Sequence, residues 1–158
     1  NVLPGVTEAI RMLGERFFII VVTNQSGIGR GLMTEEDLVA VHTELVQRLA
    51  AENASVDALY YCPHHPVYGK GPYGIYCQCR KPGPGMLTQA ARDWDLELTG
   101  SFMVGDRHTD IFAADAAGVT GIFMRGPIEE PGTAPIVVGN LVEAASMTLT
   151  LNETSARL

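Results

Sequence analysis

The chain has 158 residues, a formal net charge of −7 and 46% hydrophobic residues. This length and composition fit one globular domain with a sizeable core and exclude a disordered chain. The acidic balance, without a broad basic stripe, argues against nucleic acid as the main partner, although a local cationic pocket could still bind phosphate. No apolar run reaches membrane-spanning length, so we expect no membrane association.

The first two elements are a helix and a buried strand. Apolar residues recur at helical spacing over residues 4–14, and Pro4 suits an early helical position. The continuous apolar run over residues 17–22, FFIIVV, predicts a strand buried on both faces. A polar, glycine-containing stretch that begins at Thr23 follows it.

A long helix and a short strand come next. Thr34 is the expected N-cap of a helix that ends near Glu52, with Asp37 three residues later. The apolar positions assigned to one face of this helix are Leu38, Val41, Leu45 and Leu49. Residues 58–61 predict a short strand that leads into a cysteine-containing loop.

The second half of the chain alternates in the same way. The expected elements are a helix over residues 85–94, a strand over 101–104, a helix over 111–117, a strand over 120–124, a strand over 136–138 and a helix over 141–145. Gly118 is the expected C-terminal cap of the third of these. The segment 127–135 is a Pro/Gly-rich loop in which we find no functional signal.

This alternation predicts an α/β fold, a Rossmann-like parallel sheet in three layers with helices on both faces. We expect a single domain over residues 1–158. Ligands of such folds bind at the carboxyl ends of the strands. The polar groups expected there are Thr23 and Asn24, then Arg80 and Lys81, and then Asp106.

The three cysteines fall in one pattern together with a histidine. Cys62 and His64 are separated from Cys77 and Cys79 by a loop rich in glycine and proline, with twelve residues between His64 and Cys77. Three thiolates and one imidazole are a full tetrahedral ligand set for structural zinc. The loop 62–79 has little apolar material to bury, and metal binding could supply the free energy that orders it.

Disulfide bonding and chance spacing account less well for this pattern. Three cysteines cannot all pair as disulfides, and Cys77 and Cys79 are too close in sequence to bridge comfortably. Unrelated buried cysteines would rarely share this spacing, although His65 could replace His64 as the fourth ligand. Free cysteines at metal spacing, with no signal-peptide pattern, favour a reducing cytoplasm.

The strand-end groups are those that phosphoryl transfer needs. Thr23 and Asn24 can donate to phosphate oxygens, and Lys81 can neutralise them. Arg80 can bind a second anionic group bidentately, and Asp106 is a hard oxygen ligand suited to Mg²⁺. Taken singly, such residues are more often turn residues, solvated surface cations or helix caps. The prediction of a phosphoryl-transfer site therefore rests on their occurring together at successive strand ends.

Asp110 follows Asp106 by four residues and leaves two alternatives open. If a helix begins between them, both carboxylates face the same way. Asp110 could otherwise simply favour the positive end of its helix.

Four motifs follow one another along the chain: Thr-Asn-Gln-Ser-Gly, Cys-Pro-His-His-Pro, Cys-x-Cys-Arg-Lys-Pro and Gly-Asp-Arg-x-x-Asp. Together they resemble the haloacid dehalogenase superfamily of phosphatases. The resemblance covers residues 1 to about 125. It implies a Mg²⁺-dependent phosphomonoester hydrolase in which an aspartate forms an aspartyl-phosphate. The roles that it implies are phosphoryl stabilisation by Thr23 and Lys81, substrate recognition by Arg80, substrate contacts by Asn24, Gln25, Ser26 and Arg107, Mg²⁺ binding by Asp106, and zinc binding by Cys62, His64, Cys77 and Cys79.

Within the superfamily the match is to heptose bisphosphate phosphatases and to the related histidinol-phosphate phosphatases. The long interval between His64 and Cys77 resembles the heptose group, since the histidinol group usually has a shorter one. The expected partner is therefore a small phosphorylated sugar, cleaved by a monomer at its 7-phosphate.

The chain departs from the superfamily at one point. No strand ending in Asp-x-Asp precedes residue 17, so the expected nucleophile and general acid are absent. That strand is central in the superfamily, and we expect the sequence to be an N-terminal truncation that is inactive by itself. The alternative from another class is a catalytically inactive zinc-containing binding domain.

Overall fold

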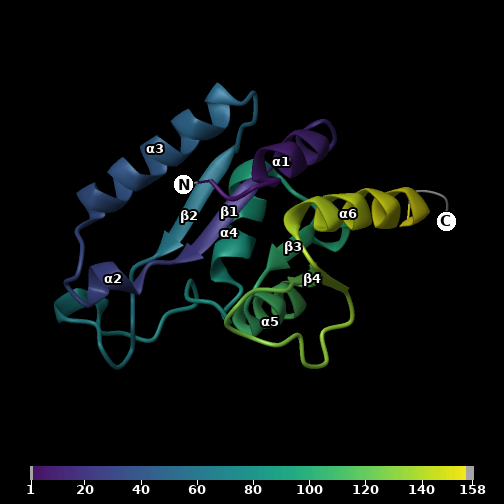
Figure 1. Ribbon diagram of the computed structural model, residues 1–158. Coiled ribbons are helices and arrows are strands. Elements are labelled where there is room, and N and C mark those ends of the chain that lie inside the picture. The colour runs from purple at the N-terminus through teal and green to yellow at the C-terminus, as the bar shows by residue number, and fades with distance from the viewer. Residues whose placement is uncertain (1, 156–158) are drawn as a thin grey trace.

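The structure, a computed structural model, describes residues 2–155 (Figure 1). Its helices and strands are α1 (Val6–Gly14), β1 (Ile20–Asn24), α2 (Ser26–Gly29), α3 (Glu35–Ala51), β2 (Ala58–Cys62), η1 (Gly71–Tyr73), α4 (Gly85–Trp94), η2 (Leu98–Gly100), β3 (Phe102–Gly105), α5 (His108–Ala117), β4 (Thr120–Met124), β5 (Val137–Val138) and α6 (Leu141–Ser155). The strands pair in parallel, which confirms the α/β class.

The strands form two separate sheets within the described range. β1 pairs with β2, and β4 lies between β3 and β5. β1 and β3 are not hydrogen-bonded to each other, and a cavity of about 680 Å³ is lined by residues of both strands. Most of this lining is apolar, so the division between the sheets is a hydrophobic groove.

Helices cover both faces of the β3–β4–β5 sheet. Met103 packs with Ala114 of α5 on one face. Its neighbours Phe102 and Val104 pack on a cluster with Ala144 of α6 on the other, as expected from strand alternation. In Figure 1, α6 lies above this sheet and α5 below it. Together with α4, which packs on β1 and β2, these helices produce the predicted three layers.

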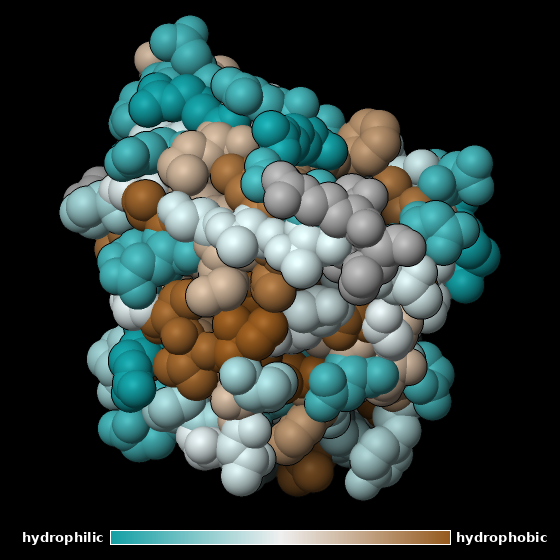
Figure 2. All heavy atoms as spheres, turned by 90° about the vertical axis from the view of Figure 1, so that its right-hand side faces the viewer, coloured by the Kyte–Doolittle hydropathy of each residue, from teal (hydrophilic) through white to brown (hydrophobic). Residues whose placement is uncertain are grey.

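α6 also packs along α1, so the last helix lies against the first (Figure 1). Figure 2 turns this side towards the viewer and shows apolar side chains gathered on one part of it. The exposed large apolar side chains of the chain include Phe112, Ile128 and Met147. Among the described residues, no helix is both long and apolar enough to cross a membrane.

Two expectations about the first half were wrong in detail. β1 begins at Ile20 and not at residue 17, and Phe18 is 56% exposed. No residue of β1 is fully buried, because residues along the strand border the groove. In α3, Val41 is 57% exposed while Leu38 is buried, since Val41 lies about 60° around the helix from Leu38.

The second half follows the predicted pattern more closely, with α4 and β4 ending at the expected residues. Gly118 caps α5 in the left-handed conformation, with a φ of 72°. α5 begins three residues earlier than expected, and α6 runs to residue 155 and not 145. The four-residue helix α2 was not expected within the stretch after Thr23.

Candidate active site and metal centre

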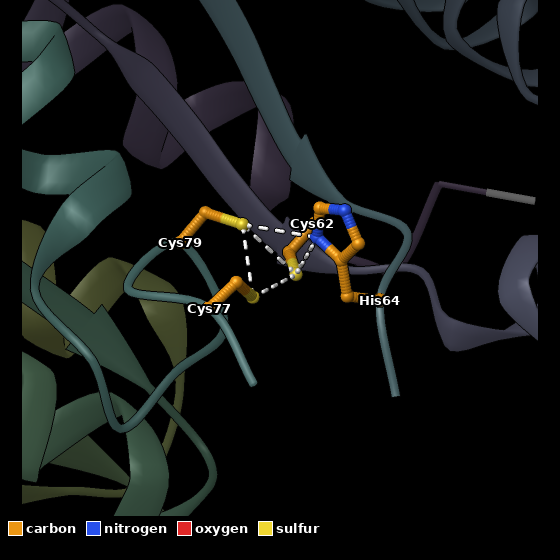
Figure 3. A group of neighbouring side chains, drawn as sticks. All are labelled: Cys62, His64, Cys77 and Cys79. Carbon is orange, nitrogen blue, oxygen red and sulfur yellow. Dashed lines mark hydrogen bonds between the residues drawn. The ribbon is translucent and has the colours of Figure 1, made fainter. Parts of the chain in front are cut away.

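The four zinc-ligand candidates converge at the end of β2 (Figure 3). Their ligand atoms, the three Sγ atoms and His64 Nδ1, all lie within 4.8 Å of one another. Cys79 Sγ is 3.2 Å from Cys77 Sγ, 3.3 Å from Cys62 Sγ and 3.3 Å from His64 Nδ1. A tetrahedral zinc with bonds of about 2.0–2.3 Å would separate its ligands by roughly 3.5 Å. The donor set and its spacing therefore fit zinc.

The structure distinguishes between the two neighbouring histidines. His64 points its Nδ1 into the thiol cluster, 3.6 Å from Cys62 Sγ (Figure 3). The Nδ1 of His65 instead accepts hydrogen bonds from the backbone N–H groups of Val67 and Tyr68, at 3.3 and 3.1 Å. His65 thus stabilises a turn of the loop, and His64 is the histidine that lies in the thiol cluster.

The pKa values of the thiols in this cluster are shifted in different directions. Burial raises the pKa of the Cys62 thiol far above its ordinary range, and a hydrogen bond with Cys79 adds to the effect. Burial also acts to raise the pKa of Cys77, but hydrogen bonds from Cys79 and from the backbone of Arg80 outweigh it and lower that pKa. A bound dication would favour the thiolate of all three.

The loop 62–79 is also held by contacts that do not involve metal. Glu35, in the first turn of α3, accepts hydrogen bonds from the hydroxyls of Tyr73 and Tyr61, at 2.9 and 3.2 Å. The backbone N–H of Lys70 donates to the Gly29 carbonyl at 2.7 Å. Residue spacing alone could not indicate this anchoring by Glu35, because the contact joins residues far apart in the chain.

Three of the polar groups expected at the strand ends line the groove, together with Asp110 of α5. Thr23, Lys81, Asp106 and Asp110 line it, although they come from β1, the segment after the zinc loop, the end of β3 and α5. Asn24, Gln25, Ser26, Arg80 and Arg107 do not line this groove. A hydroxyl, a cation and two carboxylates therefore line one groove, and the cation is in contact with one of the carboxylates.

Lys81 is fixed in this cluster by two contacts of its ammonium group. Its Nζ lies 2.7 Å from Asp110 Oδ1 and donates to the Val22 carbonyl at 2.8 Å. The Lys81 and Asp110 side chains are only 12% and 7% exposed. The other Asp110 oxygen accepts the backbone N–H of Arg107 at 3.1 Å. Asp110 therefore contacts Lys81 and also caps its own helix, and this cap agrees with the second of the two sequence alternatives.

Asp106 lies at the same end of the groove without a partner among residues 2–155 for its carboxylate. A free carboxylate at a half-buried site is a suitable hard ligand for Mg²⁺. The Thr23 hydroxyl accepts a hydrogen bond from Gln25 at 3.3 Å, so its own proton can still be donated to a phosphate oxygen. These two side chains fit the roles that metal and phosphate binding require.

The two arginines are held near the site by different groups. Arg80 donates to the backbone carbonyl of His64 at 3.2 Å, which connects the arginine to the loop 62–79. Arg107 pairs with Glu129 at 3.1 Å, and the other Glu129 oxygen accepts the backbone N–H of His108 at 2.7 Å. Glu129 lies in the loop where the sequence showed no function, and only the folded chain brings it to the start of α5.

Comparisons with known proteins agree with this geometry. A family model described as HAD-hydrolase-like matches residues 78–140, the part that contains Lys81, Asp106 and Asp110. The chain is 38% identical over 125 residues to D-glycero-beta-D-manno-heptose-1,7-bisphosphate 7-phosphatase of Rhodopseudomonas palustris, covering 78% of this chain and 69% of that protein. It is 40% identical over 136 residues to the enzyme of the same name from Yersinia pestis, covering 84% and 72%.

The fold matches as well. The crystal structure of D,D-heptose 1,7-bisphosphate phosphatase from B. bronchiseptica, complexed with magnesium and phosphate, has a TM-score of 0.79 and 34% identity. The match covers 95% of this chain and 84% of that one. The chain therefore belongs to the HAD-like phosphatases, in the family of the heptose 1,7-bisphosphate 7-phosphatases.

Proposed function

We propose that this chain carries the phosphate-binding and metal-binding half of a Mg²⁺-dependent phosphatase that removes the 7-phosphate of D-glycero-D-manno-heptose 1,7-bisphosphate. The observation that carries the proposal is the meeting of Thr23, Lys81 and Asp106 at one end of the groove, beside a Cys₃His loop. Relatives that are 38–40% identical are named for this reaction.

Each side chain has a role that follows from its position. Lys81 neutralises the transferring phosphoryl oxygens, and the Thr23 hydroxyl donates to them. Asp106 would hold Mg²⁺, which when bound would supply positive charge next to the same phosphoryl group. Arg80 recognises a second anionic part of the substrate. The remaining proposed substrate contacts are Asn24, Gln25, Ser26 and Arg107.

The groove between β1 and β3 supports the expected source of the nucleophile. Among residues 2–155, both strands have one edge paired and the other unpaired, and residues of both line the groove. A further parallel strand inserted there would satisfy both free edges and cover the apolar lining. An aspartate at its carboxyl end would lie next to Thr23, Lys81 and Asp106. We therefore propose a nucleophile on a strand outside residues 1–158, where it would form the aspartyl-phosphate.

Zinc has an organising role in this proposal. Its four ligands would be Cys62, His64, Cys77 and Cys79, so no coordination position would stay open for substrate. The ion would instead hold the loop that carries Arg80 and Lys81 against the strand ends. The long interval between His64 and Cys77 favours a sugar bisphosphate over histidinol phosphate.

The surroundings of the reaction follow from the same residues. Three free cysteines fit a reducing cytoplasm. We propose a monomer that forms one domain over residues 1–158 and whose partner is the small phosphorylated sugar.

The test is phosphate release from heptose 1,7-bisphosphate by the full-length protein, with residues 1–158 alone as the comparison. We expect turnover only from the full-length protein. Clear metal-dependent turnover by residues 1–158 would mean that the nucleophile lies within them. Zinc binding without any turnover by the full-length protein would favour the inactive binding domain.

A further inference from the structure

The side chain of Asn24, the last residue of β1, is directed at the backbone of Lys81. Its amide nitrogen donates to the Lys81 carbonyl at 3.1 Å. Its carbonyl oxygen accepts the Lys81 backbone N–H at 3.0 Å. The carboxamide therefore pairs with both backbone polar groups of one residue, across 57 positions of sequence.

The same strand also holds the other end of Lys81. The ammonium group donates to the carbonyl of Val22, two residues before Asn24, at 2.8 Å. A lysine side chain has several rotatable bonds and loses rotamer entropy when it is fixed. β1 therefore contacts both the backbone and the ammonium group of Lys81, and Asp110 of α5 holds the ammonium group from the other side, at 2.7 Å.

We infer that Asn24 is a positioning residue that acts on the phosphoryl group through Lys81 and not by binding the substrate. This inference rests on the proposed function, since it assigns Lys81 to the transferring phosphate. For the Asn24 side chain it replaces the substrate contact that the sequence predicts and that the proposed function includes.

The chemistry of the contact explains why an asparagine is needed. A carboxamide supplies one donor and one acceptor at the reach required here. An aspartate could accept the Lys81 N–H but could not donate to its carbonyl, and it would add negative charge near Asp106 and Asp110. A leucine of similar size would leave both backbone groups without these partners.

The activity test compares Asn24→Leu and Asn24→Asp in the full-length protein, with heptose 1,7-bisphosphate as substrate. A displacement of about 1 Å in a catalytic group can lower a rate roughly 100-fold. We expect Asn24→Leu to lower kcat by about this factor while KM changes much less. The kcat of Asn24→Asp should lie between those of the wild type and Asn24→Leu. Gln47→Leu, an amide removed from the exposed face of α3, is the matched control and should retain wild-type rates.

The decisive comparison repeats Asn24→Leu in the Lys81→Met background, using single-turnover phosphate release. If Asn24 acts through Lys81, the substitution has no further effect there. An equal loss in both backgrounds would mean that Asn24 binds the substrate directly and would overturn the inference. So would an unchanged kcat in Asn24→Leu.

A second readout does not depend on activity. The Lys81 backbone N–H should exchange with solvent deuterium faster in Asn24→Leu than in the wild type, measured by NMR on the full-length protein. Unchanged exchange would overturn the inference even if the enzyme turns over. Absence of turnover by the wild-type full-length protein, with faster exchange in the variant, would count against the proposed function alone.

Discussion

The ammonium nitrogen of Lys81 lies 2.7 Å from a carboxylate oxygen of Asp110, and both side chains are nearly buried. The two residues are 29 positions apart, so the pair also joins the segment after the zinc loop to α5. A substitution that removes the charge of one member leaves a nearly buried charge on the other.

The first prediction concerns the energy of this pair. Removing one partner of a buried ion pair costs about 3–5 kcal/mol, since the other charge stays desolvated. We expect Lys81→Met and Asp110→Asn each to lower the free energy of unfolding by about 3 kcal/mol, and the double variant to lose clearly less than the sum. Urea denaturation measures all three.

The matched control is the exposed pair Arg16–Glu153, whose side chains are 52% and 53% exposed. Arg16→Met should cost less than about 1 kcal/mol. Strict additivity of the Lys81 and Asp110 substitutions would contradict the pairing.

The second prediction separates His64 from His65. Only His64 points at the thiols, whereas His65 accepts backbone N–H groups within the loop. We expect His64→Ala to contain far less than one equivalent of zinc and His65→Ala to retain about one, measured by elemental analysis of folded protein. The reverse result would exchange the two roles, and little zinc in the folded wild type would argue against the site itself.

The third prediction is a pH effect at Glu129. Hydrogen bonds from the His108 backbone and from Arg107 hold the pKa of Glu129 below its ordinary value of 4.5. Because the folded-state pKa is lowered, its contribution to stability is present above pH 4.5 and is lost as the pH falls through the folded pKa. Glu129→Gln should therefore be less stable than the wild type at neutral pH, with a difference that disappears in acid.

Thermal unfolding at several pH values measures this difference. Glu130→Gln removes a neighbouring carboxylate that is 95% exposed, and it should leave stability almost unchanged at each pH. A constant gap between Glu129→Gln and the wild type down to strong acid would show that the charge of Glu129 is not responsible.

The fourth prediction concerns the start of α3. The Thr34 hydroxyl accepts the Asp37 backbone N–H, and the Asp37 carboxylate accepts that of Thr34, which completes the expected capping box. Thr34→Ala should cost about 1 kcal/mol. The control is Thr43→Ala, which removes an exposed hydroxyl that donates a hydrogen bond to the Val39 carbonyl within the same helix. This substitution should be neutral or slightly stabilising. Equal effects of the two would contradict the cap.

Local signals in the sequence were sufficient for many of these features. The spacing of Cys62, His64, Cys77 and Cys79 predicted a group that the structure brings together, because a short loop can return a chain to its own strand end. The Thr34 cap and the Gly118 stop depend on adjacent residues, so they could also be predicted. The carboxyl-end rule for parallel strands then indicated that Thr23 and Asp106 lie at one edge.

Contacts between distant segments could not be predicted in this way. The pairing of Asn24 with Lys81, and of Glu129 with Arg107, depends on how loops pack after the sheets have formed. The length of α6 was underestimated because its last ten residues, SMTLTLNETS, are rich in poor helix formers. Packing of this helix on α1 and on the sheet, with Thr148 buried, outweighs that weak propensity.

The proposed activity can be measured as phosphate release from D-glycero-D-manno-heptose 1,7-bisphosphate by the full-length protein with Mg²⁺, followed by ³¹P NMR. We expect loss of the 7-phosphate with the 1-phosphate retained. The kcat/KM should be at least about tenfold above that for histidinol phosphate, a difference of about 1.4 kcal/mol in transition-state binding. Equal or faster turnover of histidinol phosphate, or release of the 1-phosphate first, would show that the assigned substrate or cleavage position is wrong.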